Sequence, residues 1–150
     1  MIIYFLISAL VVALDQGLKF FITANYQVGE VQEIIPHILS FNYLQNDGAA
    51  SNIFSGQMWF FYIISAIVIP VVIYFIIKER RGHWSFKLGL AFVLGGILGN
   101  LIDRIRLHYV VDMFQLDFMH FNIFNVADAG ITVGIIFIFI YLIFLDKEDK

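Results

Sequence analysis

Hydrophobic residues form four long, nearly unbroken runs along this chain. They cover approximately residues 2–22, 58–77, 86–102 and 126–145. Each run approaches the ~20 residues with which an α-helix, rising 1.5 Å per residue, crosses a hydrocarbon core of ~30 Å. The pattern predicts four transmembrane helices. The first run is expected to be retained rather than removed as a signal peptide, because Asp15 and Lys19 lie where a cleavage region would begin.

Two segments between these runs, 23–56 and 105–124, are more polar and contain many strand-forming residues. Glu33–Leu44 reads EIIPHILSFNYL, and Tyr109–Phe124 reads YVVDMFQLDFMHFNIF. Branched and aromatic residues of this kind favour strands. We therefore expect an all-α membrane bundle with a small β element on its surface. An interfacial loop whose aromatic residues anchor at the headgroups is the alternative.

Composition excludes an ordinary soluble domain. The 150 residues are 61% hydrophobic and 14% charged, with a mean hydropathy of +0.86. The chain shows no linker or repeat, so we expect one domain over residues 1–150. Its net charge of −3 and the lack of a basic aromatic face argue against a nucleic-acid partner. The absence of cysteine excludes disulfides and thiol catalysis.

The distribution of basic residues predicts the orientation in the membrane. The segment between the second and third runs and the C-terminal tail are basic, and 27–57 contains no Lys or Arg. The basic residues concerned are Lys78, Arg80, Arg81, Lys87, Lys147 and Lys150. Because cytoplasmic loops are enriched in Lys and Arg, both termini should be cytoplasmic and segments 23–56 and 105–124 should lie on the outer face.

Two carboxylates, Asp112 and Asp128, are the strongest candidates for chemistry. Ionisable groups beside hydrocarbon are unfavourable and usually functional. Two close carboxylates can share a proton, so that one activates water while the other protonates an amide carbonyl, with no metal or cofactor. Asp117 lies five residues after Asp112, and spacing alone does not choose between them. Asn125 and Asp128 also fit a capping box at the start of the fourth helix.

Further polar residues have structural interpretations. Asp15 and Lys19 are spaced for an i,i+4 ion pair that orients its neighbours. Asn100, Asp103 and Arg104 close the third run, where Arg104 suits a helix C-terminus and is expected to clamp a carboxylate rather than contact substrate. Glycines with small-xxx-small spacing should let the last two helices approach closely, namely Gly95, Gly96, Gly99, Gly130 and Gly134. Zinc HExxH, serine GxSxG and GxGD signatures are absent.

Five motifs occur in order over nearly the whole chain: ALDQGLK, NDGAAS, GGILGNLIDR, VVDM and FNVADAGI. Together they resemble the bacterial lipoprotein signal peptidases, or signal peptidase II. The resemblance implies an aspartyl endopeptidase of the cytoplasmic membrane that cuts a prolipoprotein before its diacylglyceryl-modified cysteine. It assigns catalysis to Asp112 and Asp128 rather than Asp117. It also implies a β-cradle on the membrane surface, a closing lid loop, membrane lipids as neighbours, and inhibition by globomycin and myxovirescin; we expect a monomer.

The resemblance also assigns residues that shape or line the site: Asp15, Lys19, Asn46, Gly48, Asn100, Asp103, Arg104, Asn125 and Ala127. The chain departs from the family pattern in two places. Ser51 and Asn52 stand where an aromatic residue is usual, and Met113 replaces the phenylalanine of VVDF. The first departure affects the expected lid loop, whereas methionine fills irregular apolar space and is tolerable.

Other functions make different predictions. A small transporter or proton relay would use Asp15, Lys19, Asp103 and Asp128 and would need polar groups throughout the depth of the membrane. The acids instead lie toward the outer ends of the predicted helices. A structural or chaperone-like membrane protein would explain the glycines but not the paired aspartates, and the intact motifs argue against an inactive relative.

Overall fold

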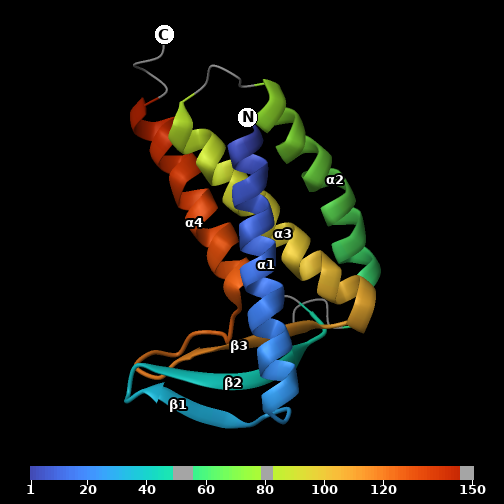
Figure 1. Ribbon diagram of the computed structural model, residues 1–150, viewed down its shortest axis with the longest axis vertical. Coiled ribbons are helices and arrows are strands. Elements are labelled where there is room, and N and C mark those ends of the chain that lie inside the picture. Colours follow the sequence, from blue (N-terminus) through green and yellow to red (C-terminus); the bar gives the residue numbers. More distant parts are fainter. Residues whose placement is uncertain (49–55, 79–82, 146–150) are drawn as a thin grey trace.

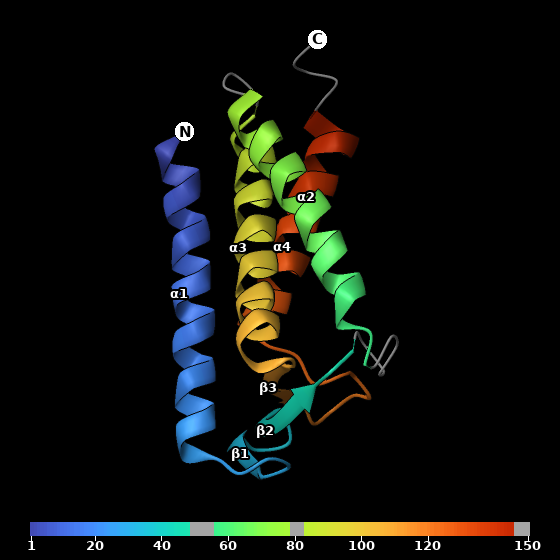
Figure 2. The ribbon, with the colours of Figure 1, turned by 90° about the vertical axis from the view of Figure 1, so that its right-hand side faces the viewer.

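The computed structural model describes residues 1–48, 56–78 and 83–145. Within them, four helices stand side by side, and a small sheet lies across one end of the bundle (Figures 1 and 2). The helices are α1 (Ile2–Asn25), α2 (Met58–Lys78), α3 (Trp84–Leu107) and α4 (Val126–Ile140), and α4 continues into a π-helical turn, η2 (Tyr141–Leu145). All four are long and apolar enough to cross a membrane, which confirms the prediction of a four-helix membrane protein.

Helix α3 extends further than its apolar run. It ends at Leu107, five residues beyond the predicted end at 102, and His108 caps it in the left-handed conformation with a φ of 62°. Asn100, Asp103 and Arg104 therefore lie within the last turns of the helix rather than at its end. Asp103 remains helical because it is buried against the Lys19 ammonium, at 2.9 Å, instead of facing water.

The sheet has three antiparallel strands in the order β1 (Val31–Ile35), β2 (Leu39–Asn46) and β3 (Val110–Leu116). The predicted strand region 33–44 thus holds parts of two strands joined by a turn. Pro36 lacks a backbone donor, and His37 adopts a φ of 60°, so the chain reverses there. The expected sheet is confirmed, and it rests against the end of the bundle rather than forming a plain interfacial loop.

A small hydrophobic core fixes the sheet to the helices. Ile22 of α1 packs with Tyr43 of β2 and with Val111 and Met113 of β3. Met113 is fully buried, so it fills apolar space as expected. Phe124 bridges to Phe114 of β3 through backbone hydrogen bonds, which places the start of α4 beside the sheet.

Glycines bring α3 against α4, as predicted, and also against α1. A Cβ added to Gly89 would lie 2.6 Å from the carbonyl oxygen of Gly134, and one on Gly95 would lie 2.8 Å from the carbonyl oxygen of Ser8. A Cβ on Gly99 would lie 2.6 Å from the Asp15 carboxylate. Only glycine permits this spacing, and it places the polar residues of three helices within hydrogen-bonding distance of each other.

Candidate active site

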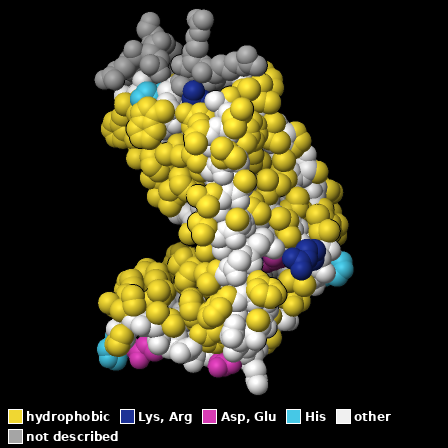
Figure 3. Space-filling model, in the orientation of Figure 1, with side chains coloured by type: hydrophobic (Ala, Val, Ile, Leu, Met, Phe, Trp, Pro, Cys, Tyr) yellow, Lys and Arg dark blue, Asp and Glu magenta, His cyan; other side chains and the backbone are white. Residues whose placement is uncertain are grey.

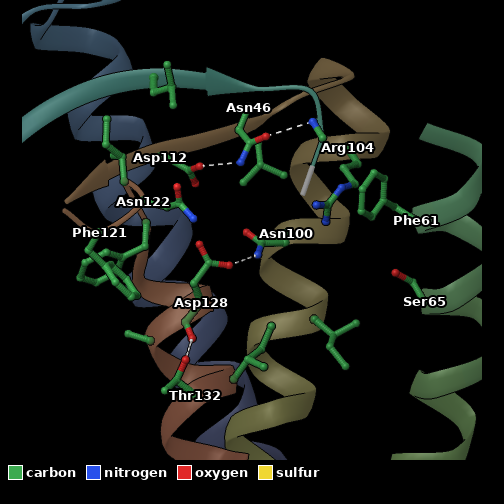
Figure 4. A pocket seen from close by; sticks show the side chains of 18 of the residues that line it. Asn46, Phe61, Ser65, Asn100, Arg104, Asp112, Phe121, Asn122, Asp128 and Thr132 are labelled. Atoms are coloured by element: carbon green, nitrogen blue, oxygen red, sulfur yellow. Dashed lines mark hydrogen bonds between the residues drawn. The ribbon is translucent and has the colours of Figure 1, made fainter. Parts of the chain in front are cut away.

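A cavity of about 1040 Å³ lies where α2, α3 and α4 meet the sheet. Its walls are largely hydrophobic, and both candidate carboxylates, Asp112 and Asp128, line it (Figure 4). The space-filling view shows the apolar surface of the helices separated from the sheet by a hollow (Figure 3). The two aspartates, sixteen positions apart in the sequence, therefore face the same cavity near the end of the bundle.

Asp112 lies in β3 opposite Leu44 of β2. Only 1% of its surface is exposed. One of its oxygens accepts a hydrogen bond from Asn46 at 2.9 Å and the other accepts one from Asn125 at 2.7 Å. Two amide side chains thus hold this carboxyl group in a fixed orientation toward the cavity.

Asp128 lies in the first turn of α4 and completes the predicted capping box. Its backbone N–H donates to the Asn125 side chain at 2.9 Å, and its own carboxylate accepts from the Asn125 N–H at 3.2 Å. Its other oxygen accepts from the Asn100 amide at 2.8 Å. Asp128 nevertheless lines the cavity. The cap therefore orients a carboxylate that remains available to a ligand.

Asn125 connects the two aspartates. It is fully buried, and its amide nitrogen donates to Asp112 while its amide oxygen caps the helix that carries Asp128. The same nitrogen contacts the Asn100 oxygen at 3.1 Å. One side chain therefore sets the relative positions of a strand residue and a helix residue.

A buried ion cluster supports this arrangement from the side of α1. The Lys19 ammonium lies 2.8 Å from Asp15 and 2.9 Å from Asp103, and it donates to Asn100 at 3.0 Å. The predicted Asp15–Lys19 pair is present, and Lys19 is 3% exposed rather than extended to the interface.

Each carboxylate of this cluster also holds a backbone N–H. Asp15 accepts from Ala127 at 2.9 Å, and Asp103 accepts from Val111 at 3.1 Å. Ala127 directly precedes Asp128, and Val111 directly precedes Asp112. A single lysine therefore anchors, through two carboxylates, the peptide groups next to both candidate catalytic residues.

Sequence reasoning missed Gln16. Its amide nitrogen donates to Asp103 at 2.8 Å and to the Gly99 carbonyl at 3.1 Å, so it completes the cluster. Gln16 directly follows Asp15 in the motif ALDQGLK, and this position could have identified it as a site residue. On the sheet side, Asn46 accepts from the Gly48 N–H at 3.0 Å, which ties the two predicted loop residues together. Ser51 and Asn52, on which the lid interpretation depends, lie outside the described residues.

Arg104 lies in the last turn of α3, as predicted, but its side chain makes a different contact from the one expected. Its guanidinium carbon lies 4.3 Å from the centre of the Phe61 ring of α2, and it lines the cavity. No ion pair joins it to a carboxylate within the described part of the chain, and its buried Nε has no hydrogen-bond partner there. The expected clamp on a carboxylate is therefore not formed among these residues. Figure 4 shows the side chain beside the space that a substrate would occupy.

The structure separates Asp112 from Asp117, which spacing could not do. Asp117 follows β3, accepts from the Ser40 hydroxyl at 2.7 Å and from Gln115 at 3.0 Å, and is not among the residues that line the cavity. Side chains alternate between the faces of a strand, so residues five positions apart point in opposite directions. Asp117 therefore has a structural partner elsewhere.

Burial, together with the smaller effect of the negative charge of Asp128, raises the pKa of Asp112 to about 7. The hydrogen bonds from Asn46 and Asn125 oppose this shift without cancelling it. Asp112 is thus suited to hold a proton near neutral pH, as one member of a proton-sharing pair must. Among the described residues, no group of three or more His, Asp or Glu side chains is placed to bind a metal ion.

A family model described as signal peptidase (SPase) II matches residues 7–144. This chain belongs to the signal peptidase II family. It is 58% identical to the lipoprotein signal peptidase of Lactobacillus gasseri, over 99% of this chain and 96% of the relative. It is 52% identical to that of Enterococcus faecalis, over 100% of this chain and 93% of the relative.

Solved structures agree with family membership. A bacterial membrane enzyme determined at 2.3 Å resolution superposes with a TM-score of 0.93 at 36% identity, covering all of this chain and 93% of the other. A second, at 1.9 Å, has a TM-score of 0.89 over 97% of this chain and 95% of the other. The resemblance seen in the five motifs is confirmed, and the chain is a multi-pass membrane peptidase.

Proposed function

We propose that this signal peptidase II cleaves prolipoproteins before their diacylglyceryl-modified cysteine, with Asp112 and Asp128 as its catalytic pair. The observation that carries the assignment is the connection of these two carboxylates through Asn125 within one cavity. Family membership supports the substrate class. The proposal gives the two aspartates complementary roles in hydrolysis of an amide.

Asp112 supplies the proton and Asp128 acts as the base. Asp112 holds a proton near neutral pH because it is buried beside a second carboxylate. Asp128 removes a proton from water, whose oxygen then attacks the scissile carbonyl carbon, while Asp112 protonates the carbonyl oxygen. When the carbon–nitrogen bond breaks, the proton taken by Asp128 passes to the leaving amine. Asp112 recovers its proton from the tetrahedral hydroxyl, so the pair is ready for another cycle.

The proposed orientation places the site at the outer face of the membrane, with both termini cytoplasmic. Lys78 ends α2 and Lys87 lies in the first turn of α3, far from the sheet, whereas Glu30 and Glu33 lie at the sheet. Figure 1 shows the N-terminus and η2 at the end of the bundle opposite the sheet. The positive-inside tendency supports this orientation. A monomer then meets its lipid-anchored substrate within the bilayer, so anchoring supplies much of the positioning.

A proton relay is less well supported. Helix α2 carries no acidic or basic side chain between Met58 and Ile77. In α1, Asp15 and Lys19 lie in the half nearer the sheet, and the other half carries no Asp, Glu, Lys, Arg or His. A relay across the membrane would need such groups at every depth.

Cleavage of a lipidated precursor tests the proposed activity. We expect purified protein in detergent to cut a diacylglyceryl-modified prolipoprotein and to leave the same unmodified precursor essentially intact. Mass spectrometry should find a mature product that begins with the lipidated cysteine. Equal cleavage of the unmodified precursor would contradict the substrate assignment, and a product beginning elsewhere would contradict the cleavage site.

The pH dependence of cleavage tests the protonated state of Asp112. Because its pKa is about 7, the fraction of protein with a protonated Asp112 falls as pH rises through 7. We expect kcat/KM to fall about tenfold for each pH unit well above that value. The measurement is a pH profile between 5 and 9 with a neutral precursor. A profile that stays flat from 6 to 9 would contradict the role of Asp112 as the acid.

A further inference from the structure

A second hollow lies between α2 and α3, separate from the aspartates. This groove, of about 520 Å³, is lined on α2 by Tyr62, Ser65, Ala66 and Pro70 and on α3 by Leu101 and Ile105. Its surface is almost entirely apolar apart from the hydroxyl groups of Tyr62 and Ser65. The Tyr62 hydroxyl donates its hydrogen bond to the Arg104 backbone carbonyl at 2.7 Å, so its proton is not available to a ligand.

Ser65 is common to the groove and the catalytic cavity. It lines both spaces and is only 6% exposed. Figure 4 shows its hydroxyl pointing from α2 toward the cavity, on the wall opposite Asp112 and Asp128. Arg104 lies on the same wall, over the Phe61 ring, and its buried Nε lacks a hydrogen-bond partner among the described residues. The junction of the two spaces thus presents the Ser65 hydroxyl as a hydrogen-bond donor in apolar surroundings.

We infer that this junction binds an ester carbonyl of the substrate's diacylglyceryl group and that the groove holds the acyl chain of that ester. The inference rests on the proposed function and specifies how its lipid is recognised. An ester carbonyl is an uncharged acceptor, which suits the Ser65 hydroxyl and avoids burial of a net negative charge.

The shape of the groove favours an acyl chain over a peptide. From Ser65 to Pro70 it follows α2 for about 8 Å, at 1.5 Å per residue, away from the sheet and toward the middle of the bundle. A chain that starts at an ester beside Ser65 therefore continues in the direction of the bilayer interior. A peptide backbone would leave its own N–H and C=O groups unsatisfied against Ala66, Ile69 and Leu101.

A large side chain that fills the groove tests whether the acyl chain of the substrate binds there. Ala66 lines the groove but not the catalytic cavity, and the next residue, Ile67, is exposed and lines neither space. We expect Ala66→Trp to raise KM for a dipalmitoyl precursor about three- to tenfold and to leave KM for a dibutanoyl precursor unchanged. Ile67→Trp, the matched control, should leave both values unchanged.

Removing the hydroxyl tests the ester contact. With Ser65→Ala, KM for the diester precursor should rise about three- to tenfold, as expected for one lost hydrogen bond. A precursor whose two chains are joined by ethers lacks the carbonyl, so Ser65→Ala should not change its KM. An equal rise for ester and ether substrates would show a structural role for Ser65 and overturn the contact.

Photo-crosslinking tests the groove without altering α2. A precursor with a diazirine at the end of each acyl chain is incubated with the Asp112→Asn variant and mapped by mass spectrometry. Label is expected on Ile69, Pro70 or Leu101, and label confined to α1 or α4 would overturn the inference.

Equal KM values of Ala66→Trp and Ile67→Trp for the dipalmitoyl precursor would also overturn the inference. In either case continued cleavage by the wild type would leave the proposed function standing, whereas no cleavage of any lipidated precursor would refute that function itself.

Discussion

Replacement of Asp112 by asparagine is expected to lower kcat about 10²- to 10⁴-fold while the protein remains folded. The asparagine preserves the size of the side chain but removes the proton that we assign to the scissile carbonyl. The measurement is cleavage of a diacylglyceryl-modified precursor, alongside a thermal unfolding curve of the variant. Asp128→Asn should have a comparable effect, because the base is lost.

Asp117→Asn is the matched control for this experiment. Asp117 accepts from Ser40 and Gln115 and does not line the cavity, so its variant should keep most of the activity. Full activity in Asp112→Asn would refute the catalytic pair. Loss of activity in Asp117→Asn without loss of thermal stability would move the assignment to Asp117.

Replacement of Lys19 by methionine is expected to destabilise the protein by about 3–5 kcal/mol, because two buried carboxylates lose their cation. Lys19 is 3% exposed and lies within 3 Å of both Asp15 and Asp103. Since these carboxylates hold the peptide groups before Asp112 and Asp128, cleavage should fall together with the unfolding temperature.

Lys78→Met is the control, since Lys78 is exposed at the end of α2, and its ammonium lies 5.4 Å from the centre of the Tyr74 ring. Its replacement should change the unfolding temperature little. Adding Asp103→Asn to Lys19→Met removes one of the unpaired carboxylates and should recover part of the lost stability. If Lys19→Met unfolded at the wild-type temperature, the ion cluster would not be the anchor that we describe.

The helices of this fold could be predicted because hydrophobic run length sets the span across a bilayer. The end of α3 could not, since charged residues normally mark the exit from the membrane. Here Asp103 is neutralised by Lys19, a residue of another helix, and Arg104 lies over Phe61. Both partners are remote in the sequence, so no local pattern reveals that the helix continues to Leu107.

In the site, too, local motifs could be predicted from the sequence, whereas contacts between remote residues could not. The capping box of Asn125 and Asp128 is a local motif and was readable from the sequence. The choice of Asp112 over Asp117 depends on which strand face meets the bundle, and the resemblance to a family had to supply it. Ser65 was not recognised, because one serine in an apolar run carries no signal until its helix is placed beside Arg104.

The hydrogen bonds of Asn125 limit which parts of this protein can move to admit a substrate as large as a signal helix. Since one amide side chain holds both the strand of Asp112 and the helix of Asp128, any hinge between the sheet and α4 would pull the two acids apart. Widening of the cavity is therefore expected on the side of α2, whose Tyr62 hydroxyl contacts a carbonyl of α3 rather than either acid. We therefore expect α1, α3, α4 and the sheet to keep their relative positions while a substrate enters, and α2 to move away from them.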